Sequence, residues 1–361
     1  MKKLASFIVI LGGLFLITAS QSSCTSRQSQ AVHIPTAVDK HGWLTIKDGK
    51  MVDENGVAPR LRGISFSWSI WEGRKYYNTE VIDWIVDDFQ VDLLRFSMAI
   101  EPDSGYLDFP DEQKALITGM IDHAIDRGVY VLIDWHDHHA NENIDAAKYF
   151  FDEMAQRYKD VPNVLYEIWN EPEEHSWAEI KAYSEELIKT IRVHDQKNLI
   201  VIPSARWDQD VDITAKDPIT SDGQLIYSFH FYTSDPWHQE NLRKKAEEAM
   251  QAGLPIIVSE WGVSESNGDG DFNLETTNRW VEWMDTHQLS WANWNITDKD
   301  ETSALLKPGA PIDAHWQANE LTEAGNYIRE VLRTDTPTSP EGVNKAQQVE
   351  DSSTNEKELV N

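Results

Sequence analysis

The strongest constraint on the fold is a regular alternation of short β-branched runs and longer amphipathic stretches. Eight runs resemble buried strands, at residues 61–65, 92–98, 129–134, 164–168, 198–202, 225–230, 255–259 and 290–294. Helical periodicity fills most of the intervals, at 79–89, 111–127, 144–158, 177–194, 242–252 and 273–287, and again at 321–332. This alternation favours a parallel α/β sheet with right-handed crossovers, and eight strands close a (β/α)8 TIM barrel.

The barrel is expected to occupy one domain, residues 41–333. The turn residues Asp48 and Gly49 lie between apolar runs at 43–46 and 51–52, which predicts a small β-hairpin before the first barrel strand. We expect this hairpin to cap the bottom of the barrel. No internal repeat and no Pro/Ser-rich linker divides this region.

Both ends of the chain differ from this pattern. Residues 1–24 combine Lys2 and Lys3 with an apolar run at 4–19 and small residues before Cys24, which predicts an export signal. The position of Cys24 resembles that of the lipid-bearing cysteine of bacterial lipoproteins; ordinary cleavage nearby is the alternative. Residues 25–40 are predicted to form a flexible tether and residues 334–361 a disordered acidic tail. Anchoring at the outer membrane, on either face, or secretion is expected.

Charge and cysteine content exclude several function classes. The chain has 32 Lys and Arg against 61 Asp and Glu, a net charge of -29. Nucleic acid and anionic lipid surfaces require clustered cations, so neither is an expected partner. Because Cys24 is the only cysteine, intrachain disulfides and zinc sites with several thiolates are excluded. A neutral polysaccharide remains compatible, and a monomer is expected.

Polar residues lie where the predicted strands end. In a TIM barrel the carboxyl ends of the strands supply the catalytic residues. These ends carry Arg95, His136, Asn170, Glu171, His230, Tyr232, Glu260 and Trp294. For either glutamate alone a solvated loop carboxylate is the alternative, but the ordered series is difficult to explain by packing.

Two facing carboxyl groups are the requirement for glycoside cleavage. One protonates the leaving oxygen, while the other attacks the anomeric carbon or activates water. Glu171 and Glu260 fit this pair, and Asn170 is suited to hold a sugar 2-hydroxyl. Their separation, which decides between retention and inversion, does not follow from the sequence.

Together these residues and motifs resemble the glycoside hydrolase family 5 cellulases, and in particular their bacterial endoglucanase branch. The motifs are Tyr166-Glu-Ile-Trp-Asn-Glu-Pro172, His230-Phe-Tyr232, Val258-Ser-Glu-Trp-Gly262 and Trp291-Ala-Asn-Trp294, together with Arg95 and His136. The resemblance implies endo-acting, retaining cleavage of β-1,4-glucans, with Glu171 as acid/base and Glu260 as nucleophile. Mixed-linkage glucan, mannan or xyloglucan is the nearer alternative substrate, and a non-catalytic glycan-binding lipoprotein is the distant one.

Supporting roles follow for the other residues. Arg95 and Tyr232 are expected to keep Glu260 ionised, and His230 to tune or relay the proton of Glu171. Glu171 is expected to start protonated, because a second carboxylate nearby disfavours its charge. His136 is expected to line the sugar site.

Substrate-binding residues follow from the resemblance as well. It implies sugar-stacking platforms at Trp71, Trp207 and Trp294, and a hydroxyl-binding loop with Lys299 and Glu301. For the last two a solvated charge cluster is the alternative. Ser67 stands where many relatives carry a sugar-contacting histidine, which leaves fine specificity open.

No cofactor or metal is expected. The run His136-Asp-His-His139 looks at first like a metal cluster, but His136 is already assigned to the sugar site. Dinucleotide, phosphoryl-transfer and serine-hydrolase motifs do not occur in the sequence.

Overall fold

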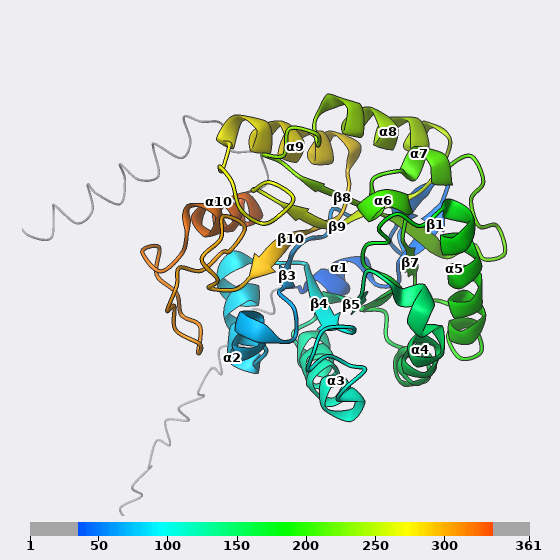
Figure 1. The fold of residues 1–361 in the computed structure, drawn as a ribbon, viewed down its shortest axis with the longest axis horizontal. Coiled ribbons are helices and arrows are strands. Elements are labelled where there is room, and N and C mark those ends of the chain that lie inside the picture. Colours follow the sequence, from blue (N-terminus) through cyan, green and yellow to red (C-terminus); the bar gives the residue numbers. More distant parts are fainter. Residues whose placement is uncertain (1–34, 335–361) are drawn as a thin grey trace, which may run out of the picture. The chain divides into compact units, whose positions relative to one another are not determined.

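The computed structural model describes residues 35–334, which form a closed barrel of eight parallel strands (Figure 1). The strand order is β10-β3-β4-β5-β6-β7-β8-β9, so each strand pairs with its neighbour along the chain and β10 closes onto β3. The predicted (β/α)8 barrel is therefore confirmed. The strands are β3 (Arg62–Phe66), β4 (Leu93–Ala99), β5 (Tyr130–His136), β6 (Val164–Glu167), β7 (Ile200–Ile202), β8 (Leu225–Tyr232), β9 (Ile256–Gly262) and β10 (Trp291–Ile296).

Helices cover the outside of the barrel (Figure 1). The long ones are α3 (Pro110–Asp126), α4 (Ile144–Tyr158), α5 (Trp177–Arg192), α8 (Glu240–Gln251), α9 (Leu274–His287) and α10 (Glu323–Arg333). The predicted helix at 79–89 is α2 (Thr79–Trp84) continued by a π-helical turn over Ile85–Phe89. Between β7 and β8 the chain forms only two short helices, α6 (Ala205–Asp208) and α7 (Val211–Thr214).

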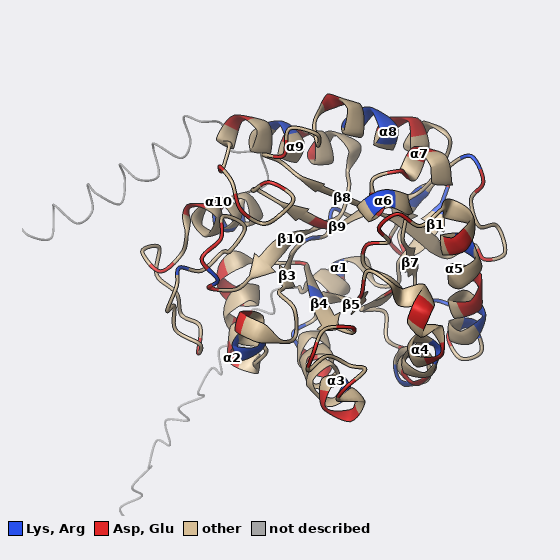
Figure 2. Cartoon of the chain, in the orientation of Figure 1, with Lys and Arg blue, Asp and Glu red and all other residues tan. Residues whose placement is uncertain are grey.

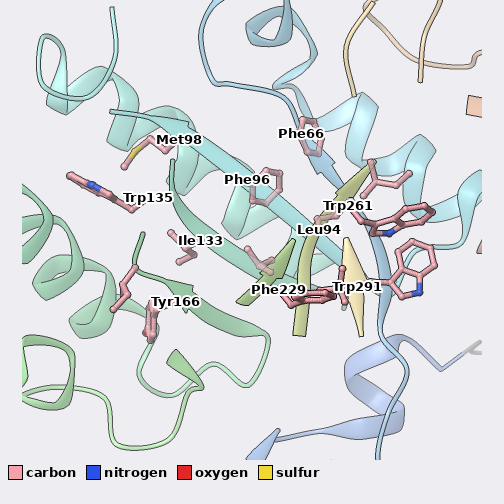
Figure 3. Close-up of a cluster of buried hydrophobic side chains, with 14 of the residues drawn as sticks. Phe66, Leu94, Phe96, Met98, Ile133, Trp135, Tyr166, Phe229, Trp261 and Trp291 are labelled. Carbon is pink, nitrogen blue, oxygen red and sulfur yellow. The ribbon is translucent and has the colours of Figure 1, made fainter. Parts of the chain in front are cut away.

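The two faces of each strand have different roles. Side chains that point outward pack against the helices in a large apolar layer, which includes Phe96, Ile133, Tyr166 and Phe229 (Figure 3). Side chains that point inward near the strand starts form a second, smaller apolar cluster, with Leu93, Leu132, Leu165, Ile226 and Ile257 among its members. Because side chains alternate with a period of two, the inward positions further along each strand lie above this inner cluster.

The N-terminal hairpin closes the barrel at the strand starts, as expected. Strands β1 (Thr45–Lys47) and β2 (Lys50–Val52) pair antiparallel, and their turn uses positive φ at Asp48 and Gly49. Leu44 and Met51 belong to the inner apolar cluster. The hairpin therefore seals the barrel floor with apolar side chains.

The folded region begins before residue 41, which corrects the boundary of the predicted tether. Residues Ala37–His41 form the helix α1, and Thr36 and Asp39 make reciprocal capping bonds at its start. Ala37 is buried in the inner cluster. The apolar contact and the cap order this segment although its composition is typical of a tether.

Charge is distributed mainly over the outside of the fold. Acidic side chains occur on the surrounding helices and on many loops (Figure 2). None of the helices within residues 35–334 has the length and apolar character needed to cross a membrane. The predicted signal segment with Cys24 and the predicted acidic tail lie outside the described residues, apart from Thr334.

Candidate active site

A layer of buried polar side chains lies directly above the inner apolar cluster. On β4, Arg95 lies two positions after Leu93, and on β5 the same step leads from Leu132 to Asp134 and then to His136. The alternation of the strands therefore points these polar groups into the barrel. The corresponding inward positions on β8 are Ser228, His230 and Tyr232.

Arg95 is the hub of this layer and is fully buried. Its Nε donates to Glu167 Oε2 at 2.7 Å, and one terminal nitrogen donates to Glu260 Oε2 at 2.7 Å. The other terminal nitrogen donates to Asn170 Oδ1 at 2.6 Å and lies 2.9 Å from Asp134 Oδ2. Burial opposes its charge, but the surrounding carboxylates, Asp134 first, raise the pKa of Arg95 well above its usual value. The guanidinium therefore stays charged and fixes Glu260 and Asn170 together.

Glu260 receives a second hydrogen bond from the opposite side. The Tyr232 hydroxyl donates to Glu260 Oε1 at 2.6 Å. Burial, reinforced by the charge of Glu260, raises the pKa of Tyr232 well above its usual value, so the hydroxyl keeps its proton. Each oxygen of Glu260 thus accepts one hydrogen bond, and the two bonds fix the orientation of the carboxylate.

His230 binds the other central carboxyl group. Its Nδ1 lies 2.9 Å from Glu171 Oε1, and its Nε2 lies 2.9 Å from the Ser259 hydroxyl. Burial disfavours the imidazolium, but the nearby carboxylates, of which Asp208 acts most strongly, raise the pKa of His230 well above its usual value. Burial likewise opposes the charge of Glu171, yet the hydrogen bond from His230 lowers the pKa of Glu171.

This direction differs from the expectation that Glu171 starts protonated. That expectation rested on repulsion by Glu260 and gave His230 only a tuning or relay role, whereas in the structure the imidazole is hydrogen-bonded to Glu171. Both pKa shifts favour the protonated imidazole of His230 as the donor and Glu171 Oε1 as the acceptor of this hydrogen bond. His230 and Glu171 therefore form a coupled pair that holds one proton.

A left-handed turn places Asp208 beside the pair of His230 and Glu171. Arg206, Trp207 and Asp208 have consecutive positive φ values of 54°, 53° and 57°. Such conformations are unfavourable for residues with a Cβ, by about 1–2 kcal/mol each. The turn buries Asp208 completely, with Oδ2 3.7 Å from His230 Nδ1, and leaves Trp207 36% exposed. Within the described residues Asp208 Oδ2 has no hydrogen-bond partner.

His136 is held between Asp134 and the rings that line the site. Its Nδ1 lies 2.6 Å from Asp134 Oδ2, and its ring stacks on Trp294 with a centroid distance of 5.2 Å. Trp68 meets the His136 ring edge-on at 4.2 Å. Burial, assisted by the charge of Arg95, lowers the pKa of His136 well below its usual value. A neutral ring that donates from Nδ1 leaves Nε2 as an acceptor.

A cleft of about 220 Å³ opens above the two central glutamates. One carboxylate oxygen of Glu171 and one of Glu260 lie within 4.8 Å of each other, with His230 in the same group. The predicted residues that also line the cleft are Trp71, His136, Asn170, Tyr232, Trp294, Lys299 and Glu301. Ser67, which stands where many relatives carry a histidine, lines it as well. Trp207 does not contribute to this lining, although its backbone N–H bonds to the carbonyl of Pro172, next to Glu171.

Several buried groups of the site were missed in the sequence. Asp134, Glu167, Asp208 and Ser259 each contact a predicted site residue. For Asp134 a signal exists: a polar residue two positions before His136, inside an apolar strand, shares its inward face. For Asp208 the sequence has no signal, because only the left-handed turn directs it inward.

The comparisons with known proteins agree with this geometry. A sequence model described as Cellulase (glycosyl hydrolase family 5) matches residues 52–300. Endoglucanase A of Evansella cellulosilytica is 37% identical over 346 residues, which cover 94% of this chain and 68% of that protein. Endoglucanase N of Pectobacterium atrosepticum is 37% identical over 84% of this chain and 70% of its own length.

Solved structures share the whole barrel. A structure from Cytophaga hutchinsonii matches with a TM-score of 0.80 at 40% identity and covers 82% of this chain and 96% of that one. The catalytic domain of the Thermobifida fusca endoglucanase Cel5A, in complex with cellotetraose, matches with a TM-score of 0.79 at 31% identity. That match covers 83% of this chain and all of the other. The chain belongs to the cellulases of glycosyl hydrolase family 5.

Proposed function

We propose that this glycoside hydrolase cleaves internal β-1,4-glucosidic bonds of cellulose-type glucans with retention of anomeric configuration. The observation that carries the proposal is the approach of Glu171 and Glu260 to within 4.8 Å between carboxylate oxygens. Retaining enzymes need carboxyl groups about 5–5.5 Å apart, whereas inverting enzymes leave about 6.5–9.5 Å for a water. The curated relatives named endoglucanases and the cellotetraose bound to a homologue support an internal glucan bond as the target.

In the first step Glu260 attacks the anomeric carbon. Arg95 and Tyr232 each hold one of its oxygens, so the attacking carboxylate is oriented before substrate arrives. The bond between the anomeric carbon and the bridging oxygen breaks, and a glycosyl ester forms on Glu260. Asn170, fixed by Arg95, is positioned to bind the sugar 2-hydroxyl in the charged transition state.

The leaving oxygen takes its proton from Glu171. The proton that rests on His230 reaches Glu171 through the 2.9 Å hydrogen bond, and the leaving group then receives it. In the second step Glu171 removes a proton from water, and the hydroxide breaks the ester on Glu260. His230 can take that proton back, which restores the coupled pair.

Aromatic side chains provide the sugar platforms. Trp71 lines the cleft and is 60% exposed. Trp294 also lines the cleft, and one face of its ring stacks on His136. Indole faces pack well on the apolar faces of glucose rings. We assign Trp207 to a position beyond the cleft beside Pro172, and the ion pair of Lys299 and Glu301 to hydroxyl binding at the rim.

The decisive experiment measures reducing-sugar release by the full chain from carboxymethyl cellulose, lichenan, mannan and xyloglucan. Rapid loss of viscosity on carboxymethyl cellulose, abolished in Glu171→Gln, is the expected result. Proton NMR of a cello-oligosaccharide digest should reveal the β-anomer first. Activity confined to mannan or xyloglucan would transfer the chemistry to another glycan, and inactivity on all four would favour a binding protein.

We also propose export and lipid attachment at Cys24, with the enzyme held at the outer membrane. The support is the sequence of residues 1–24. In a Gram-negative host, Cys24→Ser should move the protein from the membrane fraction to the soluble fraction and abolish labelling by a fatty-acid analogue. Unchanged fractionation and labelling would exclude this anchor.

A further inference from the structure

Three ligand-type side chains from two loops converge beside the catalytic cleft. Glu101 follows β4, whereas Asp137 and His139 follow β5. One potential ligand atom from each lies within 4.8 Å of the others. His139 Nδ1 is 2.6 Å from Glu101 Oε1, and its Nε2 is 3.8 Å from Glu173 Oε2.

This cluster is separate from the catalytic groups of the same loop. His136 is bonded to Asp134, and His138 Nδ1 contacts the backbone carbonyl of Glu171. The loop therefore directs His136 and His138 to the catalytic side and Asp137 and His139 to the other. None of Glu101, Asp137 and His139 lines the cleft above the central glutamates.

Asp137 supplies an independent sign of a missing partner. It is 1% exposed, and its Oδ1 accepts the backbone N–H of His139. Its Oδ2 is buried without a hydrogen-bond partner among the described residues. A buried carboxylate oxygen with no donor is costly unless a cation or a proton compensates it.

No Lys or Arg supplies that compensation in the described part of the chain. The ion pairs of Glu101 and Glu173 within residues 35–334 are made with His139 alone. Three carboxyl groups thus surround a single imidazole. Among the described residues His139 is thus the only basic partner of these carboxyl groups, which leaves the cluster without a fixed cation of its own.

We propose that Glu101, Asp137 and His139 bind one divalent transition-metal ion, for which Zn²⁺ is the best fit. Imidazole nitrogen and carboxylate oxygen are both ligand types that Zn²⁺ accepts, and three protein ligands leave the fourth tetrahedral position for water. A histidine ligand is less suited to Ca²⁺, which prefers six to eight oxygens. Glu173 would accept a hydrogen bond from the second nitrogen of His139, as outer partners of metal-bound histidines commonly do.

The ion would connect three loops around the cleft. Glu101 and the pair Asp137 and His139 join the ends of β4 and β5, and Glu173 belongs to the segment that carries Glu171. Metal binding should therefore stabilise the fold without taking part in the bond cleavage. This differs from the sequence expectation of no metal, which considered His136 as the principal ligand of the run.

Isothermal titration calorimetry with ZnCl₂ tests the site directly. The full chain is purified without a histidine tag and freed of metal by chelation, and MnCl₂ is titrated in parallel. We expect one zinc ion per chain, weaker manganese binding, and a higher Tm with zinc. His139→Ala and Glu101→Gln should each weaken zinc binding at least tenfold and remove the rise in Tm.

The matched control is His194→Ala, which removes a histidine of similar exposure that pairs with Asp152 on the helical layer. It should bind zinc as the unmodified chain does. If His139→Ala unfolds, Asp137→Asn replaces it, because the amide keeps the acceptor for the His139 N–H but removes the ligand charge. Absence of zinc binding by the unmodified chain, or equal binding by the cluster variants, would overturn the proposal, whatever the activity on glucans.

Discussion

His230 Nδ1 lies 2.9 Å from Glu171 Oε1, and the same ring is faced by Asp208 Oδ2 at 3.7 Å. The imidazole therefore stands between the proposed acid and a buried carboxyl group that does not line the cleft above the two glutamates. The proton affinity of the His230–Glu171 pair therefore depends on buried groups behind the site, such as Asp208. The pH dependence of catalysis is expected to respond to residues that contact no substrate.

The alkaline limb of the pH profile should depend on Asp208. Burial raises the pKa of Asp208 well above its usual value, so this carboxyl group ionises at higher pH than an exposed aspartate does. Its ionisation then holds the proton on His230, whose pKa is raised. Asp208→Asn should leave activity near neutral pH largely intact and move the alkaline limb of kcat to lower pH. An unchanged or upward-shifted limb would contradict the role of Asp208 in retaining this proton.

The loss of rate on removal of the proposed acid, Glu171, should depend on the leaving group of the substrate. Glu171→Gln should reduce kcat on carboxymethyl cellulose by about 10²–10⁴-fold, the usual contribution of general acid–base catalysis. Release of dinitrophenol from an aryl cellobioside in the first turnover should be affected much less, because that leaving group needs no proton. The exposed neighbour Glu174 provides the control, and Glu174→Gln should behave as the unmodified enzyme. Equal losses on both substrates would argue against Glu171 as the acid.

The tyrosine that holds the nucleophile should matter for rate more than for folding. Tyr232→Phe removes the 2.6 Å hydrogen bond to Glu260. A bond to a charged group contributes about 1.5–3 kcal/mol, so kcat/KM should fall about 10- to 100-fold. Tyr227→Phe is the matched control, because this hydroxyl, on the same strand, bonds to Ile219 instead. Comparable kinetic losses in both variants would refute a specific effect of Tyr232.

Glu167 should contribute to stability through its buried bond to Arg95. Although burial opposes its charge, Arg95 lowers the pKa of Glu167 from 4.5 to about 2. Its stabilisation is therefore complete above about pH 4.5 and is lost as pH falls towards 2. Glu167→Gln should cost about 3–5 kcal/mol at neutral pH in guanidinium unfolding, and the difference should shrink on acidification.

The comparison for this effect is a more exposed pair. Asp285→Asn breaks the 2.7 Å contact with Arg60, whose side chain is 30% exposed. Pairs of that kind contribute about 0–1 kcal/mol. A loss at Glu167 no larger than at Asp285 would mean that the buried arginine hub adds little to folding.

Trp71 should affect substrate binding rather than folding. Its ring is 60% exposed and lines the cleft. Trp71→Ala removes one stacking surface, which contributes about 0.5–1.5 kcal/mol to sugar binding. KM for cello-oligosaccharides should therefore rise about two- to tenfold, with Tm unchanged. Trp237 is 85% exposed but does not line that cleft, so Trp237→Ala should leave KM as it is. Similar KM changes in both variants would contradict a specific role of Trp71 in substrate binding.

Secondary structure was predictable because its signals are local. Period-two and period-3.6 patterns located all eight barrel strands and the long helices, and the strand bounds differ from prediction by at most three residues. The region between β7 and β8 has no long periodic stretch, and it forms α6 and α7 instead. The tether was misjudged at 37–40, because the composition of a short segment says nothing of the apolar surface it can cover.

The sequence by itself determined the barrel, the order of the polar strand ends and the identity of the two central glutamates. Those properties depend on the spacing of residues along one strand and its neighbours. Only the tertiary structure decided which groups surround Glu171, since Ser259, Asp208 and His230 come from different segments and meet in a buried space. The same holds for Glu101, Asp137 and His139 beside the cleft: electrostatic interactions act across space, and the distances between segments that set them arise only when the barrel closes.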